Sequence, residues 1–138
     1  MKKTIFLIFI LVSTIIFSQE NSVEVPKIVI KIPLGESIHL ENVSIKFVEV
    51  LEDSRCPKNV TCVWAGRARV LVEVTERGNH VQQKELLFGQ TKKGEIINNI
   101  LFTTEDSEIK GMTLKPHPNS EIVEDKDPFI LLIYIDRH

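Results

Sequence analysis

The sequence has only two cysteines and one tryptophan among its 138 residues. Nowhere do apolar residues recur at the i, i+3, i+4, i+7 spacing of an amphipathic helix over a helical length. No GxSxG, HExxH or glycine-rich phosphate-binding signature is present. These absences argue against a helical fold and against the common hydrolase, metalloprotease and nucleotide-binding classes.

The one long apolar run lies at the N-terminus. Lys2 and Lys3 precede the apolar stretch Thr4–Phe17, and the composition turns polar at Ser18. A basic start, an apolar middle and a small residue before the cut are the parts of an export signal. The stretch is shorter than the roughly 20 residues of a spanning helix, which favours a cleaved signal over a membrane anchor. We expect residues 1–18 to be a signal peptide. No cysteine near the cut could carry a lipid, so the protein should be secreted or periplasmic, without stable membrane insertion.

The charge balance of the expected mature chain is acidic. Cleavage after Ser18 would remove two lysines and no acidic residue, leaving 15 basic against 19 acidic residues and a formal charge of −4. This balance argues against a nucleic-acid partner and against adhesion to an anionic membrane surface. The remaining length of about 120 residues suits one domain with a modest core. We expect residues 19–138 to form a single domain and a monomer.

Segments with the two-residue period of a β-strand recur along the expected mature chain. The clearest is 67–75, where small or branched apolar residues alternate mainly with charged ones. The turn residues Arg77–Asn79 follow, and a return strand ends near Phe88, which together predict a hairpin. In the strand that begins at Val43, the apolar phase slips by one residue near Phe47–Val48, which predicts a β-bulge.

The apolar pattern near the C-terminus completes the fold prediction. The run FILLIYI, residues 129–135, follows Pro128 and is apolar throughout, which predicts a strand buried on both faces. Residues 96–104 are ambiguous between a strand and a short helical turn. Short strands separated by polar turns predict an all-β domain. We expect an antiparallel β-sandwich, with an Ig-like topology as one option, and a small β-barrel as the second choice.

The segment EDSRCPKNVTCVWAG, residues 52–66, holds both cysteines and the only tryptophan. In an exported protein a single cysteine pair forms a disulfide by default, here Cys56–Cys62. The alternatives are a redox-labile bridge and a metal site completed by His80 or His117. The spacing is not that of a CxxC redox motif, and two cysteines alone are too few for structural zinc. We expect no metal and no cofactor.

The residues that flank the cysteines have a structural interpretation and a binding interpretation. Asp53 can accept backbone N–H groups in a turn. Arg55 can pair with Asp53 or Glu52, or stack on Trp64. Trp64 can pack over the sulfurs, and the Ala–Gly pair that follows it leaves room for a close backbone approach. On the structural interpretation the loop is a staple whose tip, Lys58–Val60, is free to vary. On the other, the rigid loop is a recognition surface.

The stretch from Val50 to Gly66 resembles an element found in many small exported bacterial proteins, with the pattern E-D-S-R-C-P-x-x-V-x-C-V-W-A-G before an alternating strand. The Phe-Ser-Gln at the end of the expected signal is similar to signal ends common in the Bacteroidetes. The element is long and specific but covers only a small part of the mature chain. This uncharacterised family has no established activity, so the resemblance implies export and a disulfide and no catalytic residue.

The remaining polar residues point away from catalysis. The histidines lie in no metal-binding or catalytic motif, and we expect them to be solvated: His39, His80, His117 and His138. Adjacent acids such as Glu52–Asp53 point to opposite faces of a strand. We therefore expect a non-enzymatic binding module for a protein or a glycan, of which a protease inhibitor is one form. The alternative is a small secreted hydrolase or metal-dependent enzyme with an unrecognised site.

Overall fold

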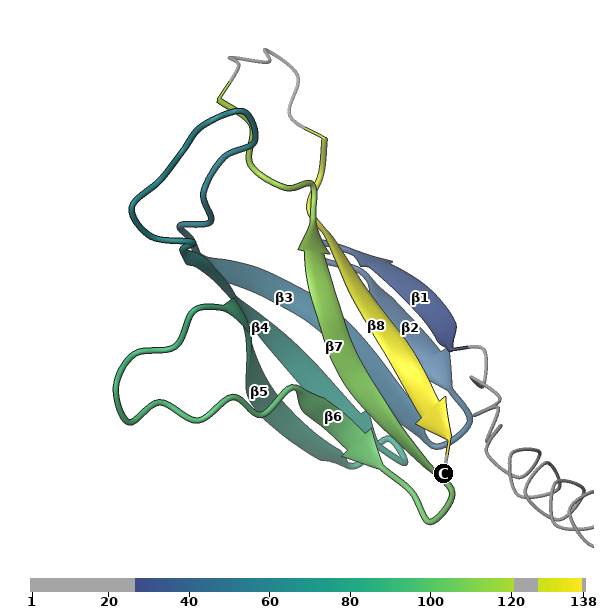
Figure 1. Cartoon of the computed structure of the whole chain (residues 1–138). Coiled ribbons are helices and arrows are strands. Elements are labelled where there is room, and N and C mark those ends of the chain that lie inside the picture. The colour runs from purple at the N-terminus through teal and green to yellow at the C-terminus, as the bar shows by residue number, and fades with distance from the viewer. Residues whose placement is uncertain (1–26, 121–126, 138) are drawn as a thin grey trace, which may run out of the picture.

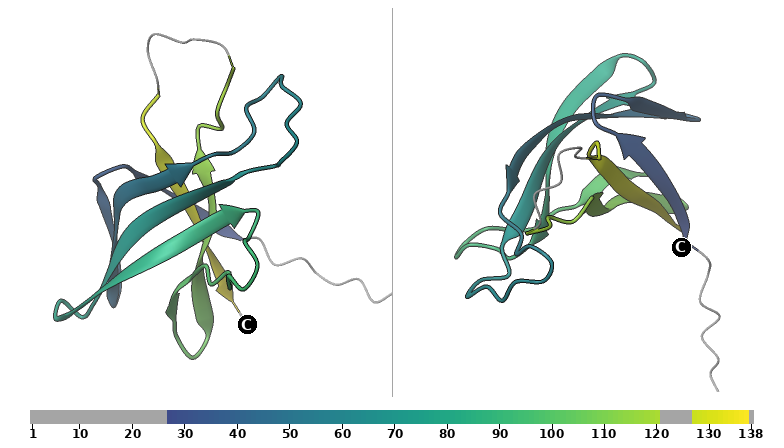
Figure 2. Two further views of the ribbon diagram at one scale, coloured as in Figure 1. Left: turned by 90° about the vertical axis from the view of Figure 1, so that its left-hand side faces the viewer. Right: turned by 90° about the horizontal axis from the view of Figure 1, so that it is seen from above.

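The computed structural model describes residues 27–120 and 127–137, so the expected signal peptide lies outside it. The described residues form two antiparallel four-stranded sheets, ordered β1-β8-β7-β6 and β2-β3-β4-β5, that face each other (Figures 1 and 2). The predicted all-β sandwich is confirmed, and the sheets do not close into the barrel of our second choice. Within the described residues, no helix is long and apolar enough to cross a bilayer. The strands are β1 (Ile28–Pro33), β2 (Ser37–Leu40), β3 (Val43–Asp53), β4 (Arg67–Glu76), β5 (His80–Gly89), β6 (Ile100–Thr103), β7 (Ser107–Lys115) and β8 (Ile130–Arg137).

The core lies between the two sheets, and β4 forms its centre on one side. The predicted alternation is confirmed, because Val70, Val72 and Val74 are buried whereas Glu73 on the opposite face is partly exposed. The predicted hairpin is confirmed as well, since β4 and β5 pair along their whole length around the turn at residues 77–79. Leu131 and Ile133 of β8 form part of the same core from the other sheet.

The predicted bulge lies in β3, where the pairing with β4 shifts between Phe47 and Glu49. A second shift, between Val50 and Glu52, has no signal in the apolar pattern. The two irregularities lie in the half of β3 that leads into the cysteine segment. They let the apolar side chains before the first shift and those after it both contribute to the core.

In the C-terminal half, the structure corrects the predicted burial of one segment and settles the secondary structure of another. The predicted burial of residues 129–135 on both faces is wrong, because only Leu131 and Ile133 are fully buried, whereas Ile130, Leu132 and Tyr134, which alternate with them, are partly exposed. A two-layer sandwich has one core, so even an inner strand of a sheet has one face outside it. The ambiguous segment 96–104 contains strand β6, not a helical turn.

Asn99 closes one side of the sandwich. Its side-chain amide pairs with both backbone groups of Leu87 on β5, accepting from the N–H at 3.0 Å and donating to the carbonyl at 2.8 Å. Its own carbonyl accepts a hydrogen bond from the N–H of Gly111 on β7 at 2.8 Å. One residue therefore satisfies part of the free edge of β5 and links it to the opposite sheet.

Candidate functional site

The connection between β3 and β4, residues 54–66, projects from one end of the sandwich (Figure 1). It carries the disulfide Cys56–Cys62, so the predicted bridge is confirmed, and the chain has no free cysteine. The bridge joins residues six apart in sequence. In the chain-entropy model, closing so small a ring contributes about 2 kcal/mol to stability. We call residues 54–66 the stapled loop.

A buried arginine fixes the base of the stapled loop. Arg55 is only 9% exposed, and its Nε and Nη2 each donate to one carboxylate oxygen of Asp53 at 2.7 Å. The guanidinium also donates to the carbonyl oxygens of Leu114 at 2.6 Å and Pro116 at 2.9 Å. The predicted pairing of Arg55 with Asp53 is confirmed. Because these four bonds use most of its donors, Arg55 ties the loop to the end of β7, not to Trp64.

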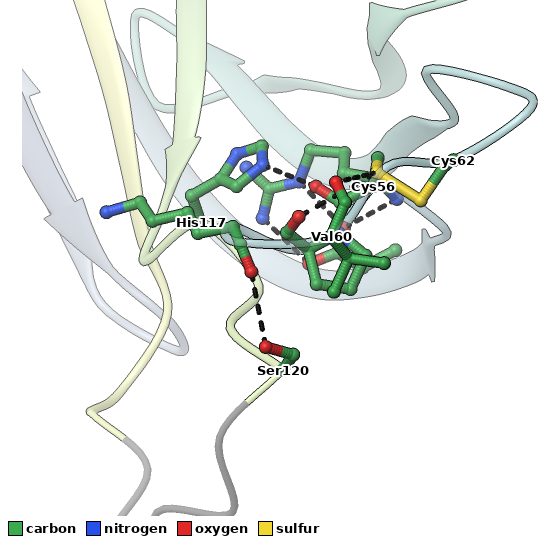
Figure 3. Close-up of a disulfide and its surroundings, with 9 residues drawn as sticks. Cys56, Val60, Cys62, His117 and Ser120 are labelled. Atoms are coloured by element: carbon green, nitrogen blue, oxygen red, sulfur yellow. Dashed lines mark hydrogen bonds and ion pairs between the residues drawn. A yellow bond between two sulfur atoms is a disulfide. The ribbon is translucent and has the colours of Figure 1, made fainter.

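The tip of the stapled loop is attached to a neighbouring loop, residues 116–120. The N–H of Lys58 donates to the carbonyl of Pro118 at 2.9 Å, and Ser120 Oγ donates to the carbonyl of Lys58 at 3.3 Å. His117 Nε2 donates to the carbonyl of Cys56 at 2.9 Å (Figure 3). His117 is therefore a structural donor and not the solvated side chain that we expected.

The expectation that Lys58–Val60 is free to vary does not hold for the backbone, although the Lys58 side chain is exposed. The backbone of Lys58 bridges to Asn119, and Asn59 has a φ of 65°. A side chain other than asparagine, aspartate or glycine is disfavoured in that conformation. The tip is constrained by its backbone and open only in its side chains.

A second buried arginine, at the start of β4, joins the base of the stapled loop to the loop between β5 and β6. Arg67, 6% exposed, contacts Glu52 through Nη2 at 2.9 Å and Glu95 through Nη1 at 2.8 Å. Glu52 also lies 3.5 Å from Arg69, which pairs with Glu85. The hydrogen bond from Arg67 lowers the pKa of Glu52 to about 2, so this carboxylate stays charged at neutral pH. Glu95 belongs to residues 90–99, which we call the second loop.

Trp64 lies where the sequence did not predict it. It does not pack over the bridge, since 71% of its surface is exposed, and the neighbouring Val63 is 89% exposed. Neither residue belongs to β4, which begins at Arg67. At the base of the same loop, the side chains of Asp53, Arg55 and Arg67 form ion pairs. We call Val63 and Trp64 the apolar knob.

The sequence gives weak signals for the second loop. Arg67 and Glu95 are 28 residues apart, and nothing in the pattern around either residue marks them as partners. The loop also exposes Ile96 at 89% and Ile97 at 46%. From the sequence, Ile96 and Ile97 could be interpreted only as part of segment 96–104, which was ambiguous between a strand and a short helical turn. Their exposure follows from β6 starting as late as Ile100.

No match was found when the chain was compared with protein-family models, with curated proteins and with solved structures. In the part of the chain that the structure describes, no three His, Cys, Asp or Glu side chains are grouped to hold a metal ion. The buried charges near the stapled loop are paired with each other and with backbone carbonyls. Chemically, this arrangement holds two loops in place, and these loops expose the large apolar side chains of Val63, Trp64 and Ile96.

Acid should weaken this arrangement in a defined range of pH. Glu52 has a pKa of about 2 in the folded protein against 4.5 for an unperturbed glutamate, so the unfolded chain binds its proton first as the pH falls. The stability that this group contributes is complete above about pH 4.5 and is lost towards pH 2.

Urea unfolding from pH 7 to pH 2 should show a shallower loss of unfolding free energy for Glu52→Gln than for the wild type. Glu49→Gln, at an exposed position of the same strand, should follow the wild type. Parallel profiles for all three proteins would contradict the assignment.

Proposed function

We propose that the protein is an exported, non-enzymatic binding module that recognises its partner through the apolar knob, Val63 and Trp64. The observation that carries the proposal is the exposure of these two side chains, at 89% and 71%, on a loop that is otherwise held firmly. Exposed large apolar residues that gather on one loop are a mark of an interaction site. Tryptophan is also among the residues most enriched at the energetic centres of interfaces.

The rigidity of the stapled loop supports the same proposal. The stapled loop is restrained at three places. The disulfide closes the ring Cys56–Cys62, the four hydrogen bonds of Arg55 fix the base of the loop, and the backbone contacts of Lys58 hold its tip. Association normally costs the entropy of ordering loops and side chains at the interface. A loop that is ordered before binding avoids much of this cost. The knob is therefore presented in a fixed position, which suits recognition more than packing.

Replacing Trp64 should separate binding from stability. Trp64→Ala should change the free energy of unfolding by no more than about 0.5 kcal/mol, because the side chain is largely exposed. In a pull-down with the exported protein, bridge intact, against the cell-envelope fraction of its source, this variant should lose the captured component. Val81→Ala removes an apolar side chain that is 57% exposed on β5 and should retain it.

Two results would count against the proposed function. The first is identical capture by the wild type, Trp64→Ala and Val81→Ala. The second is a large loss of stability in Trp64→Ala measured by denaturant melts, which would mean that the knob serves the fold.

A further inference from the structure

The second loop lies beside the stapled loop and resembles it in what it exposes. The N–H of Gln90 donates to the carbonyl of Gly66 at 3.1 Å, and the Arg67–Glu95 ion pair joins the two loops at their bases. In Figure 1 both loops extend to the left of the sandwich, the stapled loop above the second loop. Ile96 at the second loop is as exposed as Val63 in the apolar knob, at 89% each. The molecule thus has two neighbouring apolar projections.

Both loops carry positive charge and almost no negative charge. Lys58 on the stapled loop and Lys92 and Lys93 on the second loop are all exposed. The stapled loop has no aspartate or glutamate, and the single carboxylate of the second loop, Glu95, is paired with Arg67. The whole chain nevertheless has a formal charge of −2.

Three of the exposed acidic side chains lie in turns at the end of the sandwich opposite the stapled loop. The β2–β3 and β6–β7 turns lie at the opposite end of the sandwich (Figure 1) and carry Glu41, Glu105 and Asp106. At physiological salt, charges separated by more than about 8 Å are largely screened from each other. The charge close to the two loops therefore matters more for what they attract than the formal charge of the whole chain, and it includes three lysines as well as exposed Asp127, in the acidic sequence that follows the loop bonded to Lys58.

We propose that the stapled loop and the second loop together dock the protein reversibly on a bilayer surface that contains anionic phospholipid. This inference rests on the proposed function and names the class of partner. Tryptophan is favoured at the boundary between headgroups and acyl chains, and short apolar projections can enter that layer without spanning it. Lysines near the surface are attracted to anionic headgroups. A bilayer offers an apolar layer under a negative one at every point, whereas a protein would need an apolar recess for each projection.

The test uses the exported protein with its bridge intact and vesicles of two compositions: phosphatidylcholine alone and phosphatidylcholine mixed with phosphatidylglycerol. Trp64 is the only tryptophan, so the intrinsic fluorescence reports this one side chain. We expect a blue shift and co-sedimentation with the anionic vesicles, both reversed by high salt, and little of either with phosphatidylcholine alone. Mass spectrometry of the purified protein confirms that the apolar N-terminal stretch is absent and cannot itself bind the vesicles.

Matched variants separate the two loops from the rest of the surface. Lys92→Glu with Lys93→Glu should reduce the partition coefficient for anionic vesicles at least about 25-fold, since each lysine near such a surface is worth roughly a factor of five. Ile96→Ser should weaken co-sedimentation and reduce the blue shift. The controls, Lys46→Glu on β3 and Val81→Ser on β5, change exposed residues outside the two loops and should bind like the wild type.

Three results would overturn the inference: no binding to anionic vesicles, binding that Ile96→Ser and the paired lysine reversals leave unchanged, or a blue shift equal to that with phosphatidylcholine alone. If vesicles fail to bind while Trp64→Ala still loses a captured protein or glycan, the inference fails and the proposed function stands. If neither vesicles nor any captured component depends on Trp64, both fail.

Discussion

Replacing Arg55 by methionine should lower the free energy of unfolding by about 3–5 kcal/mol, because it leaves the buried Asp53 carboxylate without its cationic partner. Methionine preserves much of the apolar stem but none of the donors. The Asp53 carboxylate, whose side chain is only 14% exposed, would lose a bidentate ion pair, and the carbonyls of Leu114 and Pro116 would lose their donor. A loss of this size is a large part of the roughly 5–15 kcal/mol that holds a typical domain together.

Thermal and urea unfolding with the disulfide intact would measure this effect. Arg137→Met is the control, since it makes the same change at an exposed position at the end of β8 and should cost no more than about 0.5 kcal/mol. Asp53→Asn, which keeps one acceptor for the guanidinium, should fall between the two and covers the case in which Arg55→Met does not fold. Equal losses for Arg55→Met and Arg137→Met would show that the buried ion pair contributes nothing to the fold.

The elements that could be predicted from sequence are those whose cause is local. The alternation in β4, the turn before β5 and the phase slip in β3 are all readable within a dozen residues, and each is confirmed. The disulfide was predictable because only two cysteines exist and the chain carries an export-like N-terminus. The Arg55–Asp53 pair was readable for the same reason, since the two residues are two apart in sequence.

The errors share a different physical origin, which is contact between segments far apart in the chain. The backbone of Lys58 at the tip is hydrogen-bonded to Pro118 and Ser120, about 60 residues away, and the carbonyl of Cys56 accepts from His117 at a similar separation. Trp64 was expected to pack over the sulfurs of the disulfide, but it is 71% exposed. No pattern in one sequence reveals that Arg67 reaches Glu95 and brings the second loop beside the first.

The segment EDSRCPKNVTCVWAG thus divides into two parts with separate physical roles. Asp53 pairs with Arg55, and Glu52 pairs with Arg67 just beyond the segment, at the base of the loop, while the two cysteines form the disulfide. This leaves the apolar knob outside, as the part of the segment that the fold does not use. The same division predicts that variants of the base lose stability, whereas variants of the knob change binding alone.

Gly66→Ala should be among the most destabilising single changes in the protein, with a loss of at least about 3 kcal/mol. Gly66 has a φ of +70°, and a Cβ built there would lie 1.9 Å from the carbonyl oxygen of Ser54. That oxygen is backbone at the other side of the loop neck, where Ser54 N–H donates to the carbonyl of Arg67 at 2.8 Å. The oxygen cannot move away without disrupting the backbone pairing between Ser54 and Arg67, where β3 and β4 lead into the loop. The added Cβ must therefore displace the backbone.

Gly78→Ala separates the two causes of this loss. Gly78 has nearly the same φ, +75°, but a Cβ there meets nothing within 4 Å. Its substitution should therefore cost only the left-handed conformation, roughly 1–2 kcal/mol. The difference between the two variants in urea melts reports the close approach at the loop neck alone. If both variants lose the same stability, the neck can open to admit a methyl group, and the stapled loop is less rigid than its contacts indicate.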